Sequence, residues 1–139
     1  MNGTSPSYRL AHTSPQDFDL FLSEIRKNAK GDGGTASDQI RQRQAIIALD
    51  IPGELGLTLE QAAKRVHAKL LVVVSVQDHI VNPRPAQEFA AALNAPIVSL
   101  NSSCGHQSFA CISVGPTVAS FLADPESVHS QTMQDPGTH

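Results

Sequence analysis

The stretch from Lys69 to Phe109, KLLVVVSVQDHIVNPRPAQEFAAALNAPIVSLNSSCGHQSF, decides how this chain folds. Residues 70–75 form a continuous apolar run rich in β-branched residues, which is typical of a parallel strand covered on both faces. A helix is predicted after Asn82-Pro83, followed by a second strand at 97–100. Strand, helix and strand in this order predict a parallel pair within the α/β class.

Two polar residues with complementary chemistry follow these strands. Asp78 lies just beyond the first strand, and His106 lies just beyond the second, after Gly105. The carboxyl ends of parallel strands meet at one sheet edge, so we expect the two side chains to be neighbours. A carboxylate can orient an imidazole that acts as general base near neutral pH, which predicts the acid–base half of a catalytic triad. The alternative is that Asp78 caps its loop and His106 is an ordinary turn residue.

Helices are predicted on both sides of the two strands. One begins at Ser14-Pro15 and ends before a flexible loop, Lys30-Gly31-Asp32-Gly33-Gly34; a second spans 37–49. Thr58 and Gln61 match a capping box that starts a third. Residues 1–57 are thus expected to form a helical, lid-like segment. Residues 58–123 are expected to form an α/β part ordered helix, strand, helix, strand, helix, and residues 124–139 a polar, flexible tail.

Two strands leave the predicted sheet incomplete. A parallel sheet needs both faces and most of its edges covered, and two strands with their helices cannot supply this cover. We therefore expect this chain to be the C-terminal part of a larger domain, or to dock on a partner.

Composition narrows the possible partners and compartments. The formal net charge is −3 without a basic block, so a nucleic acid partner is not expected. No apolar run approaches the roughly 18 residues that cross a bilayer, and the first residues lack a signal-peptide pattern, so no membrane partner is expected. Cys104 and Cys111 are too few for a disulfide framework, which favours a reducing cytoplasm. Cys104 lies two residues before His106, and a small buried thiol is expected there in preference to a Cys–His nucleophile.

Other chemical motifs are weak or absent in the sequence. His67, His79 and His106 with Asp78 do not show the helical i, i+4 spacing of metal ligands, so no metal is expected. The sequence contains no Gly-x-Ser-x-Gly nucleophile elbow. Its nearest approach, residues 3–7, lacks the second Gly and follows no predicted strand. A catalytic serine would therefore have to come from outside this chain.

The segments VVVSVQDHIVNPRPAQEFAAAL and SSCGHQSFAC resemble the homoserine O-acetyltransferase family of the α/β-hydrolase fold. That family has a Ser-x-x-Asp turn followed by Pro, a helix, a strand and Gly-His-x-x-Phe. The resemblance covers residues 37–122 and is specific over 75–109. It implies the C-terminal portion of an α/β-hydrolase fold, with Asp78 as triad acid and His106 as triad base. Within the lid, the positions that match are Gln42, Ala45 and Asp50.

The resemblance also implies a reaction. The complete enzyme would transfer an acyl group by a ping-pong route, from a thioester donor such as acyl-CoA to a small acceptor, without a cofactor. The serine would come from an N-terminal half or from a partner copy. Gln107 and Arg41 replace the acidic and aromatic residues usual in members that acylate homoserine, so the acceptor stays open. Alternatives are a serine ester hydrolase of the same fold, or a truncated binding module without catalysis.

Overall fold

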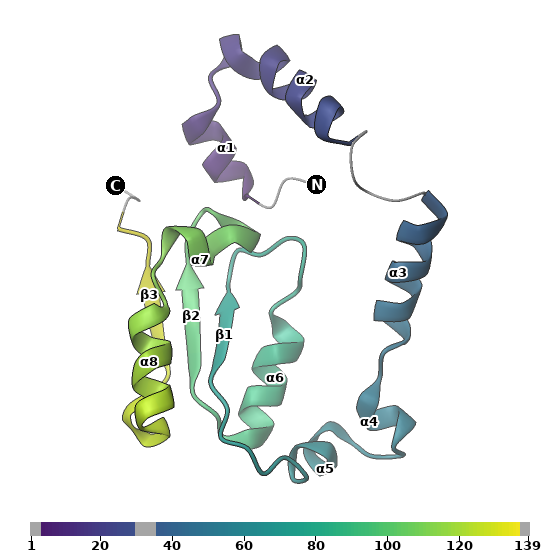
Figure 1. Ribbon diagram of the computed structural model, residues 1–139, viewed down its shortest axis with the longest axis vertical. Coiled ribbons are helices and arrows are strands. Elements are labelled where there is room, and N and C mark those ends of the chain that lie inside the picture. The colour runs from purple at the N-terminus through teal and green to yellow at the C-terminus, as the bar shows by residue number, and fades with distance from the viewer. Residues whose placement is uncertain (1–3, 30–35, 137–139) are drawn as a thin grey trace.

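The computed structural model describes residues 4–29 and 36–136, and the loop predicted at 30–34 lies outside them. Figure 1 shows the elements in chain order. The helical segment contains α1 (Pro6–His12), the 3₁₀ turn η1 (Pro15–Asp17), α2 (Phe18–Ala29), α3 (Ala36–Ala48) and α4 (Ile51–Glu54). The remainder contains α5 (Leu59–Ala63), β1 (Val72–Ser75), α6 (Arg84–Leu93), β2 (Ile97–Asn101), η2 (Gly105–Gln107), α7 (Ser108–Cys111), α8 (Gly115–Ala123), η3 (Pro125–Ser127) and β3 (Gln131–Gln134).

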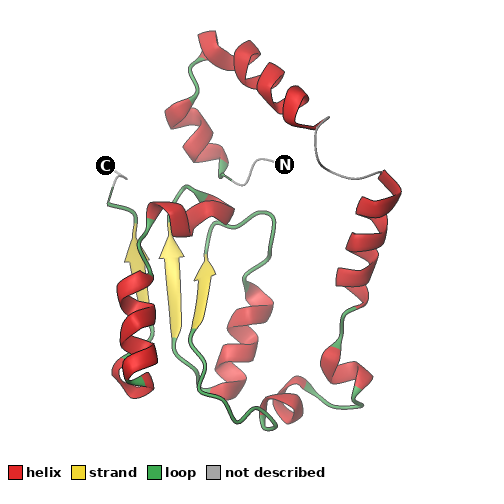
Figure 2. Ribbon diagram, in the orientation of Figure 1, coloured by secondary structure: helices red, strands yellow, loops and turns green. Residues whose placement is uncertain are grey.

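The sheet contains three parallel strands in the order β1-β2-β3. Val72 pairs with Ile97, and Val98 pairs with Gln131. All three arrows therefore end at the same edge, which faces α1 (Figures 1 and 2). The predicted α/β class and the two predicted parallel strands are confirmed.

The third strand corrects the expectation of a flexible tail over 124–139 for the part of that range at 131–134. Residues 131–134 extend the sheet beyond β2, and the Asn101 amide donates to Gln134 Oε1 at 2.9 Å. Only Met133 in β3 is partly buried, so the segment QTMQ carries no apolar run that would mark a strand. The backbone of β2 supplies the hydrogen bonds that pair with this segment. Such a long-range contact leaves no pattern in the sequence of the tail itself.

The core lies mainly around β2. Val98, Leu100 and Ile112 are buried together, and Leu71, Val114 and Met133 pack partly against them. The predicted capping box is also confirmed, because Thr58 Oγ1 accepts the Gln61 N–H and Gln61 Oε1 accepts the Thr58 N–H. It starts α5, which packs against α6. These contacts hold β1, α6 and β2 in the arrangement that brings their ends together.

The helical segment packs much less. Residues 37–51, which include α3 from its second residue onward, are all exposed, and Ile46 and Ile47 are 72% and 84% exposed. In α2 the apolar side chains are only partly covered, with Phe18 51% exposed. Thus α3 covers no part of the sheet in this chain (Figure 1). No helix in ranges 4–29 and 36–136 is long and apolar enough to cross a membrane.

Candidate functional site: an acid–base pair at the strand ends

Asp78 and His106, which the sequence places 28 positions apart, are in direct contact. Asp78 Oδ2 lies 2.8 Å from His106 Nδ1. A carboxylate only accepts, so Nδ1–H donates, and a neutral ring then carries its lone pair on Nε2. The Asp78 side chain is 11% exposed and that of His106 is 42% exposed. The acid is therefore largely enclosed, while the imidazole remains accessible from solvent.

The loop after β1 fixes the Asp78 carboxylate. Its Oδ1 accepts the backbone N–H groups of Ile80 and Val81 at 2.8 and 2.9 Å. Burial alone would raise the pKa of Asp78, but the hydrogen bonds from Val81, His106 and Ile80 outweigh it, and the pKa is lowered. Asp78 is therefore ionised near neutral pH and can stabilise an imidazolium at His106. Asp78 therefore caps its own loop, as the alternative interpretation expected, and it also contacts His106.

Two serines hold the turn that carries His106. Gly105 has a φ of 60°, a left-handed conformation that glycine adopts without a Cβ clash. The Gly105 carbonyl lies 2.7 Å from the hydroxyls of both Ser75 and Ser108, which also lie 2.7 Å from each other. The two hydroxyl groups therefore share two protons among these three hydrogen-bond contacts. Ser108 is buried. This cluster ties the end of β1 to the turn after β2, and it fixes the imidazole above Asp78.

Sequence reasoning assigned no role to Ser75 or Ser108. A signal for Ser75 was present, because it is the one hydroxyl residue that ends an otherwise apolar strand. Ser108 follows His106 by two residues and carried no comparable signal. Its role depends on the bend of η2 into α7, which brings its hydroxyl back to Gly105.

A nucleophile is not joined to this pair. Within the part of the chain that the structure describes, no side chain is hydrogen-bonded to Nε2 of His106. Ser5, in the weak Gly-x-Ser-like segment, is the N-cap of α1, and its hydroxyl accepts the Tyr8 N–H and contacts Ser7 Oγ. Ser5 therefore has a capping role.

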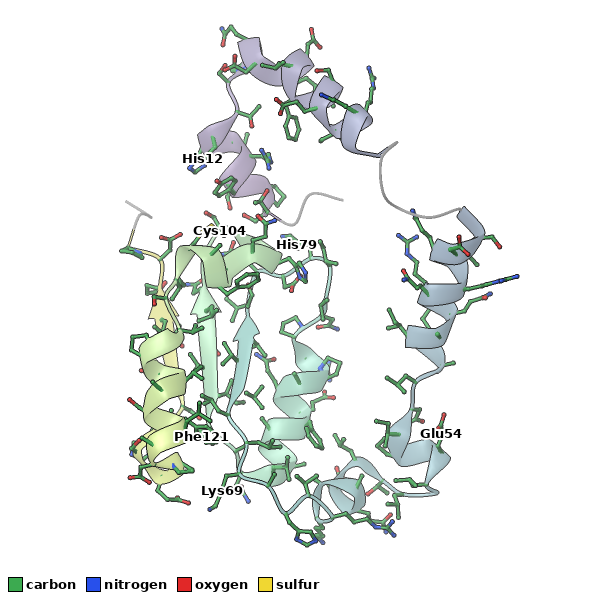
Figure 3. All side chains as sticks on the ribbon, viewed as in Figure 1. His12, Glu54, Lys69, His79, Cys104 and Phe121 are labelled. Atoms are coloured by element: carbon green, nitrogen blue, oxygen red, sulfur yellow. A yellow bond between two sulfur atoms is a disulfide. The ribbon has the colours of Figure 1, made fainter. Side chains whose placement is uncertain are left out.

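A cavity of about 710 Å³ lies at the carboxyl ends of the strands, beside the pair. Gln77 and Cys104, the near neighbours of Asp78 and His106 in sequence, line it together with His12 of α1. The Ser5 N–H donates to the Ser103 carbonyl at 3.0 Å and so attaches α1 to this edge. Figure 3 shows His12 on α1, on the side of the sheet where Cys104 lies. Asp78 and His106 themselves do not line this cavity.

The expectation of two free thiols requires correction. Cys104 and Cys111 form a disulfide, with their Cα atoms 6.6 Å apart. The bond encloses η2 and α7, so it constrains the segment that carries His106. The short helical turns place the two cysteines within bridging distance, which their sequence separation alone does not reveal.

The histidine set considered for metal binding is not brought together. Among the described residues, the one group of three or more potential ligands consists of Cys104, Cys111 and Asp135. His67 and His79 are exposed and belong to no such group.

Comparison of this chain with known protein families, curated proteins and solved structures finds no match. The geometry of the site and the sequence resemblance are therefore the only bases for a functional proposal.

Proposed function

We propose that this chain supplies the acid and base of a serine-dependent acyltransferase resembling homoserine O-acetyltransferases, as the C-terminal portion of an α/β-hydrolase fold. The 2.8 Å contact between Asp78 Oδ2 and His106 Nδ1 carries the proposal, because it leaves Nε2 as the basic nitrogen. The nucleophilic serine comes from a segment outside these 139 residues or from another chain. By itself this chain is expected to be catalytically silent.

The proposed reaction has two acyl-transfer steps. His106 Nε2 takes the proton of the supplied serine as its oxygen attacks the carbonyl carbon of an acyl thioester such as acyl-CoA. The C–S bond breaks, and the imidazolium returns its proton to the leaving thiolate. Nε2 then takes the proton of an acceptor hydroxyl as its oxygen attacks the acyl-serine. The bond between the acyl carbon and the serine oxygen breaks, the imidazolium returns its proton to that oxygen, and the ester product is released. No cofactor is needed for either step.

The open edge of β1 is an argument for a further strand that pairs with it from another segment. β1 is an edge strand, although its apolar run is typical of an interior strand, and Val73 is 38% exposed. An interior-type strand at an edge favours a sheet that continues past β1 into a partner segment. This is the side on which we propose the serine-bearing part to bind.

A serine ester hydrolase is the second candidate, and it requires only that water replace the acceptor alcohol in the second step. Exposure of His106 favours this option, because solvent reaches the ring. A binding module without catalysis is the remaining alternative. Such a module would retain the fold, and its binding to a partner would not depend on His106.

The proposal is tested by reconstitution. The chain is mixed with an N-terminal half of an acyltransferase of this fold that carries the elbow serine, and assembly is verified by co-elution. Release of free thiol from acyl-CoA is then followed with homoserine or with water as acceptor. We expect His106→Gln to lower the rate by on the order of 10³-fold. His79→Gln, at the exposed neighbour of Asp78, is the matched control and should leave the rate unchanged. Equal rates for the two variants would contradict the proposed role of His106.

We also propose the cytoplasm as the compartment, because two cysteines are too few for a disulfide framework, although the Cys104–Cys111 bond of the structure points to an oxidising compartment. A reducing environment would keep Cys104 and Cys111 as thiols, whereas an oxidising compartment would keep the disulfide. Alkylation of thiols in freshly lysed cells, followed by mass spectrometry, distinguishes the two: labelled cysteines indicate the cytoplasm, and an unlabelled disulfide indicates an oxidising compartment.

A further inference from the structure

Three potential metal ligands from separate parts of the chain meet at the carboxyl edge of the sheet. Cys104 precedes η2, Cys111 ends α7 and Asp135 follows β3. One ligand atom from each lies within 4.8 Å of the others. All three residues line the cavity of about 710 Å³ described above, so an ion there would be reachable from solvent. Neither the predicted triad nor the proposed acyl transfer uses this cluster.

The backbone spacing suits two thiolates on one ion. The Cα atoms of Cys104 and Cys111 are 6.6 Å apart, near the upper end of the range of about 4.4–6.8 Å for disulfides. Tetrahedral Zn²⁺ with Zn–S bonds of about 2.3 Å holds two sulfurs about 3.8 Å apart. Rotation of the two reduced side chains can reach that separation while the backbone stays in place. Two thiolates and a carboxylate then oppose the charge of a dication.

A buried serine orients two of the three ligands. Ser102, which is 1% exposed, donates from Oγ to Asp135 Oδ2 at 2.9 Å. The same oxygen accepts the Cys104 N–H at 3.1 Å. Partners of this kind fix the direction of a metal ligand, and their loss weakens metal binding. The arrangement therefore contains both a ligand set and a group that holds it in place.

We propose that Cys104, Cys111 and Asp135, with the cysteines reduced, form a binding site for a zinc-type divalent metal ion. A dithiol reductant opens the site by exchange: the S–S bond breaks, two thiols form, and the reductant is left as its own disulfide. The metal ion then displaces the two thiol protons and binds both thiolates and the carboxylate. Water from the cavity completes a four-coordinate shell. The ion would take over the cross-link between Cys104 and Cys111 that the disulfide otherwise supplies.

The test uses the full chain and Co²⁺ as a spectroscopic probe. The protein is reduced without oxygen, freed of reductant, and titrated with Co²⁺ while the thiolate-to-metal charge-transfer absorption is recorded. We expect one equivalent to bind, Zn²⁺ to displace it, and the oxidised protein to give no such absorption. Asp135→Asn should weaken binding by at least about tenfold, and Ser102→Ala by about tenfold. Asp19→Asn, an exposed carboxylate on α2, should leave binding unchanged.

Asp135→Asn and Ser102→Ala both retain the two thiol ligands, so a change in Co²⁺ affinity reports on the substituted residue and not on loss of a cysteine. Circular dichroism of each reduced variant verifies that it is folded. Reduced, folded wild-type protein without charge-transfer absorption would overturn the proposal. Binding that is equally tight in Asp135→Asn would also overturn it, because a dithiol alone would then hold the ion.

Discussion

The Asp78 carboxylate contacts two different structures through its two oxygens. Oδ1 closes the loop after β1, and Oδ2 meets the imidazole of His106. The first contact supports the fold and the second orients a ring nitrogen. Because one residue serves both purposes, its substitution affects stability and ring chemistry together. The two effects can be separated by pH and by the choice of variant.

Ionisation of Asp78 predicts a dependence of stability on pH. Its pKa in the folded chain lies below the ordinary value of 3.8. The carboxylate therefore contributes stability that is fully present above the unfolded pKa and is lost as pH falls through the folded pKa. Asp78→Asn removes this contribution. Urea unfolding at about pH 7 and about pH 3 should show a larger loss of unfolding free energy for wild type than for the variant. Equal losses would show that the carboxylate is not specifically stabilised.

The same substitution tests the tautomer of His106. With Asp78 as acceptor, the neutral ring keeps its proton on Nδ1. The amide introduced by Asp78→Asn can donate to Nδ1, which moves the proton to Nε2 and removes the basic lone pair. Nitrogen NMR of the ring should show this exchange, and acyl transfer in the reconstituted enzyme should fall by about 10⁴-fold. An unchanged tautomer in the variant would contradict the assigned role of Asp78.

The hydroxyl cluster at Gly105 makes a separate prediction about stability. Ser75→Ala leaves Gly105 O with Ser108 as partner and should lower the unfolding free energy by about 1 kcal/mol. Adding Ser108→Ala removes the remaining hydroxyl partner and should raise the total loss to about 2–3 kcal/mol. Ser120→Ala, at an exposed position of α8, should stay within about 0.5 kcal/mol of wild type. Denaturant unfolding measures all three, and additive small losses would argue against a shared cluster.

At this scale, the sequence predicted the pair but not what holds it. An acid and an imidazole after consecutive apolar strands indicate a common sheet edge, because parallel strands end together. The positions of Ser75 and Ser108 depend on the left-handed turn at Gly105 and on the bend into α7. Those are properties of the folded loop, and no spacing in the sequence records them.

Among the elements, β3 is the one that the sequence pattern missed. It is short and polar, and it is held by backbone pairing with β2 and by one partly buried side chain, Met133. Helices α5 and α6 were predictable because capping residues and apolar spacing act within the segment. Parallel pairing between β2 and the tail is a non-local interaction, so it depends on the rest of the sheet.

Met133→Ala tests whether β3 belongs to the sheet. Its side chain packs against Val98, Leu100 and Ile112, so truncation should cost about 2 kcal/mol of unfolding free energy. Thr132→Ala, at the exposed neighbouring position, should change it by less than about 0.5 kcal/mol. Urea unfolding distinguishes the two. Two neutral substitutions would mean that residues 131–134 do not pack on β2.

The disulfide around η2 and α7 predicts a second effect at this scale. Closing a loop of this size should add about 2–3 kcal/mol by restricting the unfolded chain. Reduction in the absence of metal should therefore lower the denaturation midpoint, measured for the oxidised and reduced forms side by side. If the midpoint were unchanged, the Cys104–Cys111 bond would contribute nothing to holding the His106 turn.

At the scale of the whole molecule, the three-stranded sheet ends at an open edge strand, β1. β1 has the composition of an interior strand but lies at an edge, and α3 is exposed over its whole described surface. The sequence predicts that the sheet continues beyond this chain, since two strands could not bury their own faces, and this stays a prediction. β3 pairs with β2 at the opposite edge of the sheet, so β1 remains an edge strand even with the third strand present. The basic nitrogen of His106 likewise faces no serine in the described chain.

Labelling with a fluorophosphonate tests the central claim most directly, because it reports an activated serine whatever the acyl donor and acceptor are. The chain and a serine-bearing N-terminal half are labelled separately and as a co-eluting complex. We predict labelling of the serine only in the complex, its loss with His106→Ala, and its retention with His79→Ala. A folded complex that is not labelled, or is labelled equally without His106, would contradict the claim that Asp78 and His106 form the acid–base half of a triad.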